Sequence, residues 1–244
     1  MTQTPSFEDL LALIEERSTA LGAAVAGAPD PEVRVPGCPD WSLRQLAEHL
    51  TEVQHFWSVA VSAGPGTEPP ADTAPPVRLA EATGDLVAAL RKSGPDAGCW
   101  AWWESTAAPR TAAAVARHQV QEAAVHAYDA QAAVGAPQPV PTAVALDGIA
   151  EFVAVTLGSS GAWPHPAARI GLHTAEGPSW LLELGHRGVR PLGADADGAA
   201  TDAALHGTAS ELLLALYVRL PWEGLRVEGD RALLGHFLEW PSLD

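Results

Sequence analysis

The segment QEAAVHAYDA, residues 121–130, places a glutamate and a histidine four residues apart in an alanine-rich run. If this run is helical, Glu122 and His126 leave the helix on the same face, about one turn apart. A carboxylate and an imidazole so placed can bind one metal ion together, because both are common ligands of zinc. A solvated surface pair has the same spacing, so the spacing alone leaves both interpretations open.

A catalytic zinc ion usually has three protein ligands and a fourth position for water or substrate, so this pair needs one more donor. His49 is the best candidate, because at about 100° per residue it lies beside the apolar seam of a predicted helix around Leu46 and Leu50. A lone histidine in such a place also fits ordinary packing. His55 and His118 are alternative donors, and the sequence does not show which histidine meets the pair.

Motifs of several other chemistries are absent from the sequence. It has no HExxH zinc-protease motif and no glycine-rich phosphate loop after a strand. It also has no GxSxG nucleophile motif. The Glu–His pair is therefore the main indication of chemistry that the residues themselves offer.

Charge and composition exclude several classes of partner. The 244 residues include 30 acidic and 14 basic side chains, for a net charge of −16, and no basic run is present. Nucleic acid is therefore not an expected partner. The N-terminus lacks the basic start and apolar stretch of a signal peptide, and we expect no later stretch to reach the roughly 18 apolar residues of a membrane span. Two distant cysteines, Cys38 and Cys99, are typical of a reducing compartment.

These observations predict a cytoplasmic protein with no membrane partner. The sequence does not predict its oligomeric state, and it assigns no role to either cysteine.

Helical periodicity predicts four long helices before residue 135, which together imply a helical bundle. Ser6 and Asp9 have the spacing of a helix start, and Ser42 with Gln45 forms a capping box before the second helix. The predicted helices cover approximately residues 6–22, 42–57, 79–90 and 111–134.

The character of the chain changes after a fifth predicted helix at about residues 142–157. The segments ARIGLHTA, SWLLELG and GVRPL alternate partly between polar and apolar residues and predict strands of an antiparallel sheet. Helical spacing returns in LHGTASELLLALYVRL, followed by a strand at LRVEGD and a last helix at DRALLGHFLEW. We therefore predict an α+β fold, with a helical bundle at 1–158 and a smaller α+β domain at 159–244.

Three segments resemble the signature regions of the mycothiol-dependent maleylpyruvate isomerase family, in the same order and across nearly the whole chain. They are VPGCPDWSLRQLAEHL, QEAAVHAYDAQAAVG, and GTASELLLALYVRLP with VEGD. The resemblance implies a DinB-like four-helix bundle with a small C-terminal α+β domain. It also implies a divalent metal ion, usually assigned as zinc, bound by His49, Glu122 and His126.

The resemblance suggests roles for Asp129 and Arg219, and the position of Trp103 just before the helix of the Glu–His pair suggests one for that residue. Asp129 matches the family's aspartate and is predicted to help bind the cofactor by orienting a metal-bound imidazole, although a surface role is equally open. Arg219 stands where the family has an arginine and is predicted to hold a substrate carboxylate, with a surface salt bridge as the alternative. Trp103 is predicted to line the cofactor pocket, although ordinary packing also explains it.

The chain departs from the family pattern at two positions that are not metal ligands. Gln121 replaces the usual histidine before the glutamate, and Tyr128 replaces a tryptophan. We therefore expect the metal ligands to be kept and the pocket wall, with the substrate it selects, to differ.

The function that the resemblance implies uses mycothiol as a thiol cosubstrate, with the thiolate held by the metal and added to a small-molecule electrophile. From the sequence we favour a thiol S-transferase. A cis-trans isomerase of the maleylpyruvate type and a non-catalytic metal-binding regulatory module are the alternatives. The sequence does not identify the electrophile or the native metal.

Overall fold

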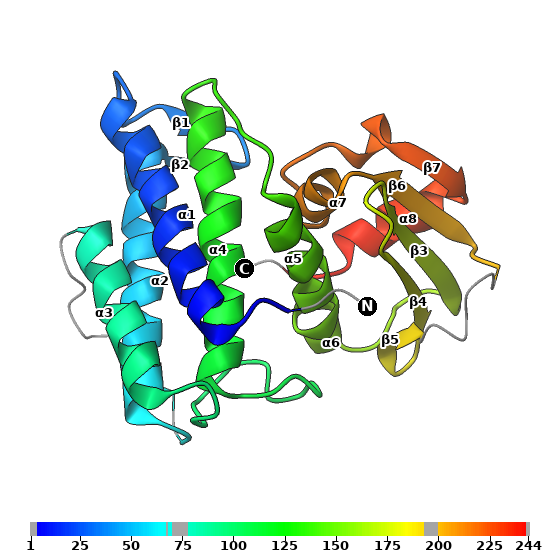
Figure 1. Cartoon of the computed structure of the whole chain (residues 1–244). Helices are drawn as coiled ribbons and strands as arrows, with labels where there is room; N and C mark the ends of the chain where they lie inside the picture. Colours follow the sequence, from blue (N-terminus) through cyan, green and yellow to red (C-terminus); the bar gives the residue numbers. More distant parts are fainter. Residues whose placement is uncertain (1–3, 67, 70–77, 193–199, 243–244) are drawn as a thin grey trace. The chain divides into compact units, whose positions relative to one another are not determined.

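The computed structural model describes residues 4–66, 68–69, 78–192 and 200–242, and the chain divides into two compact units (Figure 1). The N-terminal unit contains Thr4–Glu104 and Pro109–Val140. The C-terminal unit contains Ser105–Ala108 and the chain from Pro141 onward. A helical part and a part with a sheet confirm the predicted α+β class.

The N-terminal unit is the predicted four-helix bundle. Its helices are α1 (Phe7–Gly27), α2 (Leu43–Ala63), α3 (Leu79–Ser93) and α4 (Ala112–Ala133). The side chain of Ser6 accepts a hydrogen bond from the backbone N–H of Asp9 at the start of α1, and Ser42 and Gln45 form a complete capping box on α2. These caps satisfy N–H groups that have no partner within the helix and so define where each helix begins.

Small side chains on α4 let the other helices approach it closely. Ala123, Ala127 and Ala130 are buried in one cluster with Leu46 and Leu50 of α2. Because α4 is buried on much of its circumference, any polar group on it needs a partner inside the bundle. This packing brings the polar face of α4 toward α2.

The proline-rich segment before α2 is a short antiparallel hairpin, which the sequence analysis did not predict. Strand β1 (Arg34–Val35) pairs with β2 (Cys38–Ser42), and β1 packs against α4. Because β2 runs directly into the N-terminus of α2, it places Cys38 and Trp41 beside the first turns of that helix.

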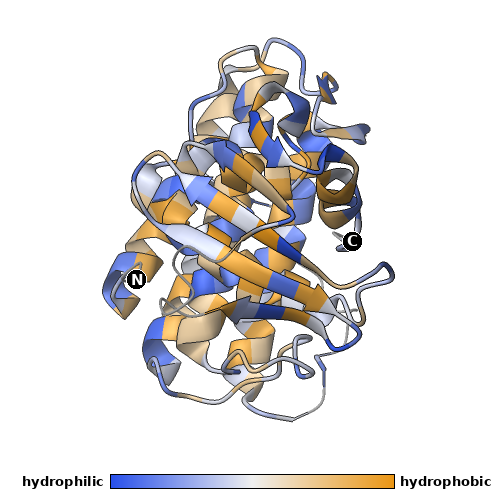
Figure 2. Ribbon diagram, turned by 90° about the vertical axis from the view of Figure 1, so that its right-hand side faces the viewer, coloured by the Kyte–Doolittle hydropathy of each residue, from blue (hydrophilic) through white to orange (hydrophobic). Residues whose placement is uncertain are grey.

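The C-terminal unit contains a five-stranded sheet with helices. The elements are α5 (Thr142–Ala154), α6 (Thr156–Ser159), β3 (Ala168–Thr174), β4 (Ser179–Gly185), β5 (Gly188–Leu192), β6 (Ala203–Gly207), α7 (Ala209–Leu216), η2 (Trp222–Gly224), β7 (Arg226–Gly229) and α8 (Arg231–Glu239). The strand order is β5-β4-β3-β6-β7. Alternate residues such as Ile170, Leu172 and Leu205 are buried, and Figure 2 shows apolar and polar residues mixed along strands and helices.

Two details of the sheet correct the prediction. Strands β3 and β6 pair in parallel, so the sheet is mixed and not purely antiparallel. Residues from Leu205 to Gly207 belong to β6, although their segment was predicted to be helical. The helix begins only after Thr208, whose side chain forms a capping box with Glu211.

The boundary between the units also lies earlier than residue 158. Helix α5 packs against α7 and therefore groups with the C-terminal unit, so the division falls between Val140 and Pro141.

Contrary to the expectation from sequence, Thr142–Ser159 has the length and hydropathy of a membrane span. Because 56% of that stretch is buried inside the protein, it is typical of a core segment.

Candidate metal centre

Helices α2 and α4 bring three predicted metal ligands together inside the N-terminal unit. Oε1 of Glu122 lies 3.1 Å from Nε2 of His49 and 3.3 Å from Nε2 of His126. One donor atom from each of the three residues lies within 4.8 Å of the other two. Two imidazoles and a carboxylate are a common donor set for a catalytic divalent ion such as zinc, so the residues present fit such an ion.

The alternative histidines are placed differently. Among the described residues, neither His55 nor His118 belongs to a convergent group of three possible metal donors. His49 reaches the site because it faces α4 from the second turn of α2, beyond the capping box at Ser42. The capping box and the alanine face of α4 together position this histidine.

The charges of Glu122 and His126 depend on each other. Burial raises the pKa of Glu122, but the charge of His126, hydrogen bonds from His126 and His49, and the charge of His118 hold it well below the ordinary value. Burial lowers the pKa of His126, but the charges of Glu122 and Asp129 and their hydrogen bonds raise it to about 9. Without an ion, Glu122 is therefore a carboxylate and His126 an imidazolium at neutral pH.

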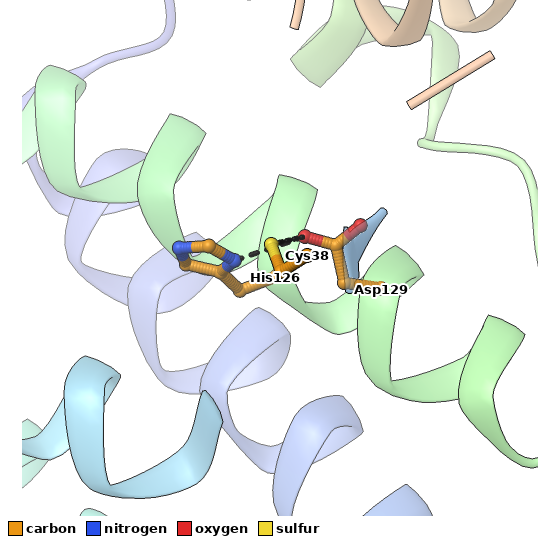
Figure 3. A group of neighbouring side chains, drawn as sticks. All are labelled: Cys38, His126 and Asp129. Carbon is orange, nitrogen blue, oxygen red and sulfur yellow. Dashed lines mark hydrogen bonds and ion pairs between the residues drawn. The ribbon is translucent and has the colours of Figure 1, made fainter. Parts of the chain in front are cut away.

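Asp129 holds the outer side of His126. Its Oδ2 atom accepts a hydrogen bond from Nδ1 of His126 at 3.0 Å, and the aspartate side chain is 1% exposed. This bond keeps the proton on Nδ1 and leaves Nε2 facing Glu122. Figure 3 shows one ring nitrogen of His126 turned toward Asp129 and the other turned away from it. A carboxylate behind a metal-binding histidine typically fixes the orientation of the ring in this way.

Sequence reasoning missed two residues of the hairpin that lie beside this site. The ring of Trp41 lies 4.5 Å from that of His49 and 6.3 Å from that of His126, centroid to centroid. The sulfur of Cys38 lies 3.8 Å from Oδ2 of Asp129. The signal available was their position in CPDW, directly before the Ser42 cap.

Trp103 lies in an aromatic cluster of the same unit. Its indole is fully buried, donates to the carbonyl oxygen of Pro109 at 3.0 Å, and has its ring centroid 5.2 Å from that of His118. Trp57 and Trp102 also contact this histidine ring. The predicted role of Trp103 in cofactor binding stays a prediction.

Arg219 belongs to the C-terminal unit, just after α7. The backbone N–H of Arg219 donates a hydrogen bond to the carbonyl oxygen of Leu214 at 2.7 Å. The backbone N–H of Val218 donates to the carbonyl oxygen of Ala215 at 3.0 Å. These two bonds form a Schellman motif, with Val218 at the left-handed position that glycine usually occupies (φ 59°). The guanidinium donates to the carbonyl oxygen of Tyr217 at 2.8 Å. Its predicted contact with substrate stays a prediction.

Comparison with known families and structures matches both units. Residues 11–131 match the mycothiol maleylpyruvate isomerase N-terminal domain, and residues 143–236 match the C-terminal domain of the same family. The first range contains the candidate metal centre, and the second contains Arg219. Comparison with curated proteins finds no significant match.

Two solved structures resemble the chain in fold. One is a crystal structure of the mycothiol-dependent maleylpyruvate isomerase, with a TM-score of 0.57 and 14% identity over 92% of this chain and 93% of that one. The other is a histidine-to-alanine mutant of the mycothiol-dependent maleylpyruvate isomerase, with a TM-score of 0.54 and 15% identity over the same shares. At this level of identity, the likeness shows that the fold is shared.

Proposed function

Because the chain belongs to the mycothiol maleylpyruvate isomerase family, we propose that it is a mycothiol-dependent enzyme that isomerises a cis double bond of the maleylpyruvate type. The observation that carries this proposal is the convergence of His49, Glu122 and His126 within the matched N-terminal domain. We put isomerisation ahead of thiol S-transfer, which the sequence alone favoured, because the matched family is named for the isomerase.

The reaction leaves mycothiol unchanged overall. The thiolate adds to one carbon of the cis double bond, and the conjugated carbonyl oxygen takes the electron pair. The former double bond can then rotate as a single bond. When the carbonyl re-forms, the same thiolate is expelled and the double bond returns in the trans form.

His49, Glu122 and His126 would hold a divalent ion, with zinc as the proposed metal. When bound, the ion would lower the pKa of a coordinated thiol, so that the thiolate exists at neutral pH. Glu122 contributes the negative charge of the set, which is stabilised in the folded protein by the two histidines.

The surrounding residues orient the donors and pack beside them. Asp129 keeps His126 in the tautomer whose Nε2 lone pair is available. The indole of Trp41 packs against the ring of His49, and its centroid lies 6.3 Å from that of the His126 ring. Arg219 is proposed to bind a carboxylate of the substrate, for which the planar guanidinium offers two parallel N–H donors.

A mass balance of thiol and product tests the proposed function. The protein is incubated with maleylpyruvate and a small, substoichiometric amount of mycothiol, and both the trans product and the free thiol are measured. Isomerisation predicts many turnovers per mycothiol with a constant amount of free thiol. Loss of one thiol per product would instead support S-transfer.

A matched variant separates catalysis from simple binding. His49→Ala is expected to abolish turnover, whereas His55→Ala, on the same helix but outside the donor group, is expected to retain it. Absence of turnover in a wild-type protein that still binds a divalent ion would overturn the proposal and favour a non-catalytic metal-binding module.

A further inference from the structure

A second group of possible metal donors lies on the other side of His126. It consists of Cys38 from β2 with His126 and Asp129 from α4, and Figure 3 shows the three side chains turned toward one another. His126 and Asp129 are buried, whereas Cys38 is half-buried. The group is therefore shielded by the bundle yet has one member that solvent reaches.

The spacing of the three donor atoms suits a metal ion. The aspartate oxygen lies 3.0 Å from Nδ1 of His126 and 3.8 Å from the sulfur of Cys38, and all three atoms lie within 4.8 Å of one another. Tetrahedral bonds of about 2.0–2.3 Å place neighbouring ligand atoms roughly 3.3–3.8 Å apart. Small shifts of these side chains would therefore accommodate an ion.

The chemistry of the donors indicates the kind of ion. A thiolate sulfur is a soft ligand, so this group selects thiophilic ions over those that prefer oxygen. The first donor group, with two imidazoles and a carboxylate, has no sulfur. The two groups therefore differ in selectivity although they share one histidine.

We propose that Cys38, Asp129 and Nδ1 of His126 form a second cation site, which binds a thiophilic divalent ion in competition with an ion held through Nε2 of His126. Binding there replaces the S–H proton of Cys38 and the Nδ1 proton of His126, both of which pass to solvent. The competition rests on the proposed function of the first donor group, whereas the second site does not.

The physical reason for competition is the single imidazole. A neutral imidazole offers one lone pair, because its other nitrogen carries the proton. Two ions can share the ring only if both nitrogens lose their protons, which is unfavourable for an isolated ring at neutral pH. An ion at Cys38 also removes the hydrogen bond by which Asp129 orients His126 toward Glu122.

Cadmium is a suitable probe, because binding of Cd²⁺ to a thiolate produces an ultraviolet charge-transfer absorption. The absorption is titrated in the wild type and in the double variant His49→Ala/Glu122→Gln, which disables the first group and leaves the second intact. Both proteins are expected to show the absorption. It is expected to be lost in Cys38→Ser and in Cys38→Ala.

Cys99 provides the matched control. This cysteine is buried, and burial raises its pKa to about 11, so it stays a thiol at neutral pH. Cys99→Ser is expected to keep the absorption. Absence of the absorption in the wild type, or its persistence without Cys38, would overturn the second site.

A second titration tests the competition separately. Mn²⁺, which prefers oxygen and nitrogen ligands, is first bound to the wild type, and Cd²⁺ is then added. We expect bound Mn²⁺ to shift the Cd²⁺ titration to higher concentrations in the wild type and to have no effect in the double variant. An unshifted wild-type titration would overturn the competition, and failure to bind Mn²⁺ would count only against the first group.

Discussion

Nδ1 of His126 lies 3.0 Å from Oδ2 of Asp129, on the side of the ring opposite to the nitrogen that faces Glu122. We therefore propose that Asp129 is a positioning residue for the candidate metal centre. Because the carboxylate is 1% exposed, water cannot readily replace it as a hydrogen-bond acceptor.

Asp129→Asn is expected to weaken divalent-ion binding by about 10- to 100-fold, the usual effect of removing a carboxylate behind a metal-binding histidine. A competition titration with a coloured chelator measures this affinity. Glu48→Gln, which removes an exposed carboxylate from α2, is the control and should leave the affinity unchanged. Equal affinities in the Asp129 variant and the wild type would contradict the role of Asp129.

Ion binding is expected to release a proton at neutral pH. The pKa of His126 is raised to about 9 in the ion-free protein, so the ring is protonated at pH 7 and must lose a proton before Nε2 can bind an ion. Affinity should therefore rise with pH and level off above about 9. Calorimetry in buffers of different ionisation enthalpy counts the protons released. Release of none at pH 7 would contradict the assignment of His126.

The same raised pKa predicts the opposite trend for stability without an ion. Because the folded-state pKa of His126 lies above the ordinary 6.5, the charged ring stabilises the fold fully below about pH 6.5. That contribution is lost as pH rises toward 9. Thermal unfolding in chelator, compared with His126→Gln, should show a decline between these pH values that the variant lacks.

Arg219→Ala is expected to lower kcat/KM by about 10- to 100-fold, corresponding to the loss of charge-assisted hydrogen bonds of about 1.5–3 kcal/mol. Divalent-ion affinity should be unchanged, because the arginine is not one of the three proposed metal ligands. Steady-state kinetics and metal titration check both parts. Arg226→Ala, which removes an exposed arginine of the same unit, is the control. Full activity in the Arg219 variant would exclude a substrate contact.

Val218→Gly is expected to stabilise the protein by roughly 1 kcal/mol. A left-handed conformation costs a non-glycine residue about 1–2 kcal/mol, and glycine removes this cost. Glycine also loses more conformational entropy on folding than valine, which offsets part of the stabilisation. Little packing is lost, because Val218 is 62% exposed. Gly94→Ala, at φ +80° with open space around it, should have the opposite effect. Denaturant unfolding that ranks these variants in reverse would contradict the assignment of strain.

The sequence predicted those parts of the site that depend on local spacing. Glu122 and His126 share a face because they are four residues apart on one helix, and the capping box at Ser42 fixes the start of the helix that carries His49. That His49 meets the pair depends on how α2 packs against α4, which no local pattern specifies. The family resemblance supplied this choice.

The hairpin and part of the sheet were missed for physical reasons. Strand β1 has two residues and β2 contains a proline, so neither shows the alternation by which strands are found. The proximity of Cys38 to Asp129, 91 positions later, is therefore visible only in three dimensions. The parallel pairing of β3 and β6 is likewise a long-range contact that local alternation does not report.

The most direct test of the metal centre is the metal content of the protein after divalent ions are supplied and excess is removed. We predict about one ion per chain in the wild type, and none in His126→Ala, which removes the imidazole common to both donor groups. His55→Ala should retain the ion. A wild type that binds no divalent ion would contradict the account and leave Glu122, His49 and His126 as a hydrogen-bonded cluster without a metal.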